Sequence, residues 1–350
     1  MKVFVLVENP FQLENPYIAT LINGVASLTD EIEWGYGIRN FWSDMIYSYD
    51  IIHVHWPDMV LGGVNRTNLK DELVEKIKCI KDNGTKIVVT CHNLKPHYTD
   101  DQLITDVYSL FFDSADAFVH LGNYSCKLLK EQYPKAKHSV ICHHTYEELY
   151  VRKNRKDCLN YLHLDSSKKY ILCFGAFRDD EERDIVDTVL KEYIKKGVEV
   201  IAPNYYKIVK RRNYLLMLKQ WIKVKIKNLL TPGLHVKGWH VTDDELPYYY
   251  GVSCVSLIQR KRILNSGNLP MGFYMGNVVV GPDIGNVGEI LQSTGNPVFK
   301  IDDKESLLNA IDEALRLSDS GKGKDNMQYA EEHYATSVIS QKLVDLYKSI

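Results

Sequence analysis

The fold is decided by residues 51–91, which read IIHVHWPDMVLGGVNRTNLKDELVEKIKCIKDNGTKIVVTC. A short β-branched run at 51–55 is followed by an amphipathic stretch at 68–82, in which leucine and isoleucine recur every three or four residues. A second β-branched run follows at 86–91. This order predicts two parallel strands that are joined by a crossover helix.

The same alternation extends along the chain in two blocks. In the first block, strands are expected at 2–7, 51–55, 86–91, 117–121 and 139–142. In the second, they are expected at 170–175, 198–202, 252–258, 277–281 and 297–301. The charged segment 147–168 separates the blocks and is expected to contain the hinge. We therefore predict an α/β protein with two Rossmann-like domains, whose parallel sheets face a central cleft.

The composition is typical of a globular protein. The chain has 350 residues and a formal net charge of -2, which excludes a globally basic nucleic-acid-binding protein. No apolar run reaches the roughly 18–20 residues that a transmembrane helix needs. The apolar run at 3–7 is too short for the core of a signal peptide. These features favour a cytoplasmic location.

Cysteine usage gives no support for disulfides or metals. The seven cysteines are scattered and form no Cys-x-x-Cys pair, which favours reduced thiols. Cys91-His92 and Cys142-His143-His144 could suggest zinc. However, their spacing matches no zinc motif, and adjacent residues of a strand point to opposite faces. We predict no metal site.

Polar residues follow the strands of the first block, where ligands of open parallel sheets bind. The candidates are His55 and Trp56, His92 and Asn93, His97, His120, and the pair His143-His144. A single histidine at a strand end is usually a hydrogen-bonded structural residue. Four such strand ends indicate a binding surface. Neutral imidazoles and amides hydrogen-bond hydroxyl groups, and an indole face packs on a pyranose ring, so this set suits a sugar.

The second block opens with a glycine and an arginine. Gly175 follows a strand and allows a ligand to approach the backbone closely, and the guanidinium of Arg178 can pair with phosphate oxygens. Taken alone, Arg178 fits equally well an ion pair with the acids at 179–181.

Two more stretches of this block fit an anion. Three cations, Arg260, Lys261 and Arg262, follow a strand. Ser266, Gly267 and Asn268 then stand at the expected start of a helix, where N–H groups attract anions. With the glycine loop 283–289, these stretches favour a diphosphate site over a set of ordinary turns.

These residues resemble the GT-B-fold glycosyltransferases, especially the retaining family-4 type of surface-polysaccharide synthesis. The resemblance spans nearly the whole chain. It is carried by IHVHWPD (52–58), TCHNLKPH (90–97), SVICHHTY (139–146), FGAFR (174–178) and SGNLPMGFYMGNVVVGPDIGNVGEIL (266–291). It implies an acceptor-binding domain at 1–160, a nucleotide-sugar-binding domain at 161–332, and a helix at 333–350 that crosses back to the first domain.

The resemblance also implies roles for single residues. His92 falls beside the donor sugar, with His97 as a weaker candidate for the same place. Arg178 matches the arginine that neutralises the diphosphate in the family. Ser266, Gly267 and Asn268 match the helix start that contacts the phosphates. Glu289 follows the glycine loop. His55, Trp56, Asn93 and His120 are then candidates for the acceptor side.

The chain departs from the family pattern at three positions. Glu181 stands where the family has a lysine, and Ile263 and Met271 stand where it has two glutamates. Arg260 or Arg262 is a candidate to replace the missing cation. These departures leave the donor sugar and its orientation open.

The expected function is transfer of a sugar from a UDP- or GDP-linked donor to a hydroxyl of a glycan or lipid-linked glycan. No Asp-x-Asp stands at a strand end, so we expect no metal and no cofactor besides the donor substrate. The resemblance implies retention of configuration. The alternatives are a GT-B-fold epimerase or phosphorylase, and a nucleotide-sugar-binding protein that has lost catalysis.

A basic segment stands apart from these motifs. Residues 200–242 contain nine Lys or Arg and no Asp or Glu. Leu215, Leu218, Ile222, Ile226 and Leu229 form an apolar stripe at helical spacing, beside Lys219, Lys223 and Lys227. Lys207, Lys210, Arg211, Arg212 and Trp221 add charge and an aromatic side chain. The pattern fits a helix that lies on an anionic membrane through residues 205–229, at the inner face of the plasma membrane. It fits equally a core-packed helix with solvated lysines.

Overall fold

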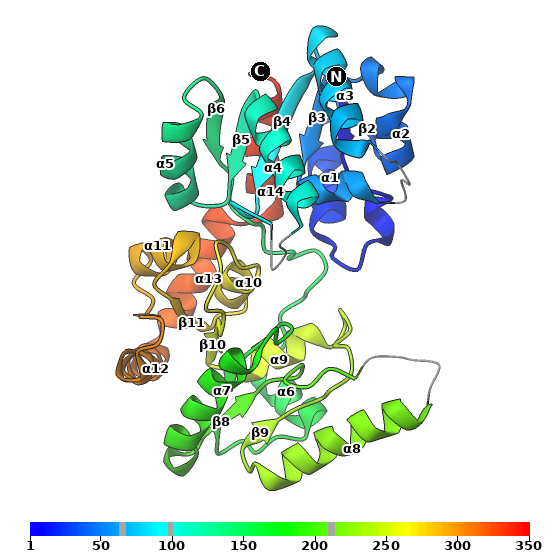
Figure 1. Ribbon diagram of the computed structural model, residues 1–350. Helices are drawn as coiled ribbons and strands as arrows, with labels where there is room; N and C mark the ends of the chain where they lie inside the picture. The colour runs from blue at the N-terminus through cyan, green and yellow to red at the C-terminus, as the bar shows by residue number, and fades with distance from the viewer. Residues whose placement is uncertain (63–67, 97–100, 209–213) are drawn as a thin grey trace. The chain divides into compact units, whose positions relative to one another are not determined.

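The computed structural model describes residues 1–62, 68–96, 101–208 and 214–350 (Figure 1). His97, Lys210, Arg211 and Arg212 lie outside the described residues. The chain divides into two compact units. The first comprises Met1–His144 and Tyr334–Ile350, and the second comprises Thr145–His333.

The first unit is built on a parallel sheet of six strands among the described residues, in the order β2-β1-β3-β4-β5-β6. The strands are β1 (Lys2–Val5), β2 (Glu33–Gly35), β3 (Ile51–Val54), β4 (Lys86–Cys91), β5 (Ala117–His120) and β6 (Lys137–Val140). The helices include α1 (Tyr17–Leu28), α2 (Ile38–Trp42), α3 (Leu69–Asp82), α4 (Gln102–Ser114) and α5 (Asn123–Gln132). The strand order reverses between β1 and β3.

The C-terminal helix α14 (Thr336–Tyr347) also belongs to the first unit. It packs closely on α1, where a Cβ added at Gly24 would lie 2.3 Å from the Ser340 hydroxyl oxygen and 2.7 Å from the Thr336 methyl carbon. A larger residue at Gly24 would therefore separate the two helices. This contact ties the end of the chain to its beginning.

The second unit repeats the architecture. Among the described residues its sheet has six parallel strands in the order β12-β11-β10-β7-β8-β9. They are β7 (Lys169–Leu172), β8 (Val198–Ile201), β9 (Leu234–His235), β10 (Val255–Leu257), β11 (Val278–Pro282) and β12 (Val298–Phe299). The helices include α6 (Arg155–Leu162), α7 (Asp180–Tyr193), α8 (Tyr214–Leu230), α9 (Leu246–Val252), α10 (Asn268–Tyr274), α11 (Gly285–Ser293), α12 (Lys304–Asp319) and α13 (Lys322–His333). Here the order reverses between β7 and β10.

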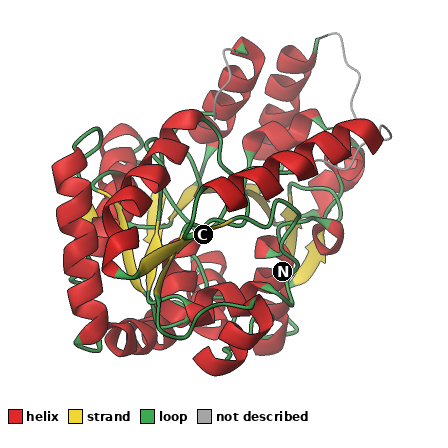
Figure 2. Ribbon diagram, turned by 90° about the horizontal axis from the view of Figure 1, so that it is seen from below, coloured by secondary structure: helices red, strands yellow, loops and turns green. Residues whose placement is uncertain are grey.

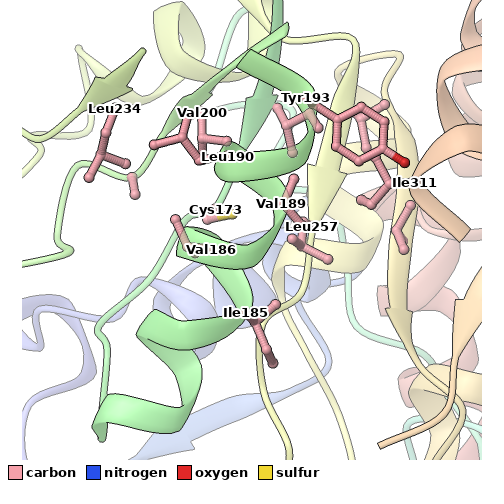
Figure 3. Packing of buried hydrophobic residues seen from close by; sticks show 14 of the residues in the cluster. Cys173, Ile185, Val186, Val189, Leu190, Tyr193, Val200, Leu234, Leu257 and Ile311 are labelled. Carbon is pink, nitrogen blue, oxygen red and sulfur yellow. The ribbon is translucent and has the colours of Figure 1, made fainter. Parts of the chain in front are cut away.

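The core of each unit lies between its sheet and the helices around it, which Figure 2 shows as red ribbons enclosing yellow strands. In the second unit, α7 turns Val186, Val189 and Leu190 toward the sheet, where they pack near Val200 and Leu257 (Figure 3). Each fully buried side chain of this size contributes about 1.5–3 kcal/mol through removal of apolar surface from water.

The structure confirms the predicted α/β fold with two parallel sheets. Two short strands, β2 and β9, were not predicted, because runs of two or three residues carry no readable alternation.

The compact units divide after His144, whereas we expected the boundary between the domains at residue 160. The reason is the packing of α6, a helix in the segment 147–168 that we expected to contain the hinge. The Cys158 side chain of α6 is fully buried, and a Cβ added at Gly251 of α9 would lie 2.8 Å from its sulfur. Helix α6 is therefore part of the second unit.

Candidate functional site

A glycine with an unusual backbone marks the strand-order reversal of the second sheet. Gly175 follows β7 and has φ +104°, a conformation that side chains of L-residues rarely adopt. A Cβ at this position would face the Asn268 side-chain nitrogen at 3.7 Å and a guanidinium nitrogen of Arg260 at 3.9 Å. Residues that follow β7 and β10 thus meet where parallel sheets bind their ligands.

An ion pair spans this reversal. The Nη1 group of Arg260 donates to both carboxylate oxygens of Glu182, at 2.6 and 2.7 Å, and its Nη2 group donates to the Ala176 carbonyl at 2.6 Å. The Glu182 carboxylate also accepts the backbone N–H of Arg178 at 2.9 Å. Arg260 and the loop after β7 are therefore held by one buried carboxylate.

Arg178 lies on the same loop and is exposed. Two of the neighbouring acids form ion pairs with other cations. Asp180 pairs with Arg183 at 2.8 Å, and Glu181 pairs with Lys261 at 3.3 Å. Arg178 is thus placed at the edge of the switch point by its backbone bond to Glu182.

The other cations after β10 are arranged differently. Lys261 also pairs with Asp302 at 2.5 Å, so its charge is largely neutralised by acids. Arg262 is exposed. Of the two candidates for the missing cation, Arg260 is the one that lies beside Gly175.

The predicted helix start at 266–268 reaches the same place. Helix α10 begins at Asn268 and has seven residues. The Asn268 amide donates to the Phe174 carbonyl at 2.8 Å and accepts from the Tyr250 hydroxyl at 3.2 Å. The Ser266 hydroxyl accepts the N–H of Asn268 at 3.3 Å. The side chain of Asn268 thus joins α10 to the loop after β7.

Close packing explains in part why glycines occupy positions 285 and 288 of the stretch 283–289. A Cβ at Gly285, where φ is +59°, would lie 3.0 Å from the carbonyl oxygens of Ile263 and Leu264. A Cβ at Gly288 would lie 2.8 Å from the backbone of Asp283. Residues 285–289 of this stretch form the first turns of α11, and Glu289 among them is partly exposed.

In the first unit, histidines from several elements gather around Tyr17. This tyrosine begins α1 and is buried. Its ring stacks on His144 with the centroids 5.0 Å apart and lies 4.6 Å from His143, 5.2 Å from His92 and 5.6 Å from His55. The strand ends of β3 and β4 and the loop after β6 thus converge, as the sequence predicted.

Hydrogen bonds join this group to the C-terminal helix. The His53 ring lies 2.5 Å from the Tyr347 hydroxyl and 2.7 Å from the Thr90 hydroxyl. His55 Nδ1 lies 3.3 Å from His92 Nε2. The C-terminal helix α14 is therefore bound to the first unit by a polar contact as well as by its packing on α1.

Burial keeps these imidazoles neutral. Desolvation lowers the pKa of His53 to about 3 and that of His143 to about 4. It lowers the pKa of His55, His92 and His144 well below the ordinary value, with a smaller contribution from neighbouring histidines. Each ring can therefore donate and accept hydrogen bonds near neutral pH. His53, His55 and His144 are almost completely buried, whereas His92 and His143 are partly exposed.

Trp56 and Asn93 lie at the border of the histidine group. The Trp56 ring stacks on His92 at 4.8 Å and is partly exposed. Asn93 hydrogen-bonds with the Tyr108 hydroxyl, which donates to Asp58 at 3.2 Å. Trp56 is thus placed with His92, whereas the Asn93 side chain faces α4.

His120 is placed elsewhere. Its Nε2 lies 2.9 Å from Nδ1 of His138. One ring nitrogen of each histidine and the Cys126 sulfur all lie within 4.8 Å of one another. These residue types can bind zinc, and no motif spacing pointed to them because they come from three elements. The ring-to-ring hydrogen bond by itself explains the approach of the histidines, so the absence of a metal site stays a prediction.

Solved structures of several other proteins resemble the whole chain. Sucrose-phosphate synthase from Thermosynechococcus elongatus superposes with a TM-score of 0.73 at 12% identity and covers 100% of this chain and 98% of that one. Anabaena HepE in complex with UDP gives 0.71 at 12%, with both chains covered completely. A protein from Listeria monocytogenes described as a UDP-N-acetylglucosamine 2-epimerase gives 0.62 at 14%, covering 99% and 96%. The chain has the GT-B fold.

The GT-B fold does not by itself determine the reaction, because a transferase and an epimerase share it. The sequence matches no protein-family model, and it matches no curated sequence. The reaction therefore depends on the residues at the two sheet edges.

Two residues of these edges were missed by the sequence analysis. Glu182 had a readable signal, because it occupies a position in the apolar stripe of α7 that continues through Val186 and Val189. A carboxylate at such a position needs a buried partner. Tyr17 had no such signal in the sequence, since an aromatic residue at the start of an apolar helix is normally part of the core.

Proposed function

We propose that this protein is a glycosyltransferase that moves a sugar from a nucleoside-diphosphate sugar to an acceptor hydroxyl. The observation that carries the proposal is the group at the β7/β10 reversal, where Gly175 exposes backbone beside Arg260 and Arg178 shares the loop. The fold likeness to HepE, which has been solved with UDP and with UDP-glucose, supports it.

The chemistry at this reversal is charge stabilisation. A leaving diphosphate gains negative charge as the sugar bond breaks, and cations held before the reaction stabilise it at no further cost of reorganisation. Arg178 is the exposed cation that would contact the diphosphate. Arg260 is already paired with the Glu182 carboxylate, which offsets its charge, so its contribution would come from its remaining N–H groups, which are held in a fixed position.

The first unit supplies groups for the sugar hydroxyls. His92, His55 and Trp56 are neutral or apolar at the edge of its sheet, and they suit a pyranose better than a charged ligand. We assign His92 to the donor sugar and His55 and Trp56 to the acceptor side. His120, which pairs with His138, is a weaker candidate than these.

The reaction retains configuration, as the resemblance to the family-4 type implies. It needs no metal, because the cations would take the place of a divalent ion in neutralising the diphosphate. The acceptor is a glycan or a lipid-linked glycan of surface-polysaccharide synthesis. The enzyme acts in the cytoplasm, at the inner face of the plasma membrane.

A radiolabelled panel of UDP- and GDP-sugars tests the reaction. A transferase is expected to hydrolyse its donor slowly in the absence of acceptor, and to do so equally well with EDTA present. If no member of the panel is turned over although UDP or GDP raises the melting temperature, the protein binds nucleotide sugars without catalysis. If neither nucleotide binds, the proposal fails.

The second candidate is an epimerase, which the likeness to the Listeria monocytogenes protein favours. An epimerase would convert the donor into a new nucleotide sugar and release no free sugar at first. Separation of the products by chromatography distinguishes this outcome from hydrolysis or transfer in the same reaction mixture.

A further inference from the structure

Helix α8 (Tyr214–Leu230) exposes large apolar side chains along its length. Leu218, Ile222 and Ile226 are 49%, 41% and 48% exposed, and Leu229 is 79% exposed. Within the described part of the chain, Val224 is the buried residue of this helix. The sequence left open whether the apolar stripe packs in a core, and these exposures show that it does not.

The exposed residues form one stripe. At about 100° per residue, Leu218, Ile222, Ile226 and Leu229 fall within an arc of about 80° on the side opposite Val224. Apolar surface of this kind is normally the buried face of an amphipathic helix. Here that face is turned outward.

Contacts on the inner face hold α8 in this orientation. The Asn228 amide donates to the Val236 carbonyl at 2.8 Å, and its oxygen accepts the Val236 N–H at 2.9 Å. Val224 lies against Gly238, where an added Cβ would be 2.8 Å from a Val224 methyl. Lys227 pairs with Asp187 at 3.4 Å. The helix thus runs beside β9 at the edge of the second sheet (Figure 1). The contacts of Asn228 and Lys227 show that its polar anchors face inward.

Lysines flank the stripe on both sides. In the same projection Lys219 and Lys223 fall on one flank and Lys225 on the other, and all three are exposed. The ammonium of Lys223 lies 4.1 Å from the centre of the Tyr206 ring, and that of Lys225 lies 5.6 Å from the Trp221 ring. No acid occurs between residues 200 and 242 to neutralise them.

We propose that α8 docks in the plane of an anionic lipid bilayer. The stripe would enter the boundary between headgroups and acyl chains, and the flanking lysines would remain among the lipid phosphates. In the described part of the chain no helix is long and apolar enough to span a membrane. This docking does not depend on the proposed reaction.

Co-sedimentation with vesicles tests the proposal. The intact protein is expected to bind vesicles of phosphatidylglycerol and phosphatidylcholine, to bind more weakly at high salt, and to bind phosphatidylcholine alone poorly. Ile222→Asp with Ile226→Asp should lower binding by about tenfold or more, since charge enters the apolar stripe. Lys219→Gln with Lys225→Gln should weaken binding to the anionic vesicles only.

The matched control is Val74→Asp with Leu128→Asp. These residues are 39% and 42% exposed on α3 and α5 of the first unit, which also carry lysines, and their replacement should leave vesicle binding unchanged. Melting curves with and without UDP or GDP verify that every variant is folded.

Two results would overturn the proposal. One is equal sedimentation of the wild type and the Ile222/Ile226 variant, or none for either. The other is a wild type that does not bind vesicles but forms a dimer in light scattering, if this dimer dissociates in the Ile222/Ile226 variant. That result would assign the stripe to a second copy of the chain.

Discussion

The guanidinium of Arg260 and the carboxylate of Glu182 form an ion pair inside the second unit, with side chains that are 14% and 2% exposed. The two residues are 78 positions apart and come from the loop after β10 and the first turn of α7. Both elements border the strand-order reversal. The pair therefore links the stability of this unit to the geometry of its candidate diphosphate site.

Glu182→Gln should destabilise the second unit by about 3 kcal/mol, because it leaves the Arg260 charge without its buried partner. The same change should weaken binding of UDP or GDP, since the loop after β7 loses an anchor. Denaturant unfolding and calorimetric titration measure the two effects. Glu181→Gln, at a carboxylate that is 58% exposed, is the control and should change stability little. Equal stability of both variants would mean that the pair is not needed.

Arg178→Ala should weaken nucleoside-diphosphate binding by roughly 1.5–3 kcal/mol, the range of a charge-assisted hydrogen bond. Titration of UDP and GDP measures the effect. Arg316→Ala serves as the control, because this arginine is exposed on α12 and pairs with Glu313. Unchanged affinity for both nucleotides in the Arg178 variant would assign the phosphate contact to another cation.

Gly175→Ala should lower both stability and nucleotide affinity. At φ +104° an alanine costs about 1–2 kcal/mol of backbone strain, and relief of that strain would move the loop after β7. Gly84→Ala is a matched control, because Gly84 has φ +87° with no atom within 4 Å of an added Cβ. It should lose similar stability and keep its affinity. If the Gly84 variant lost affinity as well, strain alone would explain the result.

His92→Ala should reduce turnover at least about tenfold while nucleotide affinity changes little, because the ring is proposed to contact the sugar. Steady-state rates and UDP titration separate the two effects. His163→Ala, at a residue after α6 that does not belong to the histidine group, is the control. Wild-type turnover in the His92 variant would move the assignment to His97, which would be replaced next.

The first unit should lose stability on acidification. Burial lowers the pKa of His53 to about 3 and of His143 to about 4, whereas an unfolded histidine titrates near 6.5. The stabilisation is complete above pH 6.5 and is lost as the pH falls toward the folded values, by up to about 1.4 kcal/mol per pH unit for each histidine.

Unfolding by denaturant between about pH 7 and pH 5 measures this slope. The variant His143→Gln should show a shallower dependence on pH whatever its absolute stability, since it removes one such group. A stability that stays constant over this range would contradict the burial of the histidine group.

The alternation of β-branched runs with amphipathic stretches was enough to predict the two parallel sheets. Each element is encoded by side-chain periodicity within a few residues, for example at 51–55, 68–82 and 86–91, and β3, α3 and β4 lie there. The convergence of His55 and His92 was also predictable, because parallel strands bring their carboxyl ends to one edge.

Contacts between residues that are distant in the sequence could not be predicted from side-chain periodicity. Tyr347 reaches His53 across 294 positions only because α14 packs on α1, and Arg260 meets Glu182 because the strand order reverses between β7 and β10. His120 shows the opposite case, since its strand-end position is equivalent to the others while its ring turns to His138.

For α8, the sequence determined the amphipathic pattern, and the tertiary structure decided which face is exposed. A helical periodicity fixes which residues share a face, but the direction of that face depends on the partners that the rest of the chain supplies. Here Asn228 and Val224 are bound by residues beside β9, and the apolar stripe is therefore turned outward.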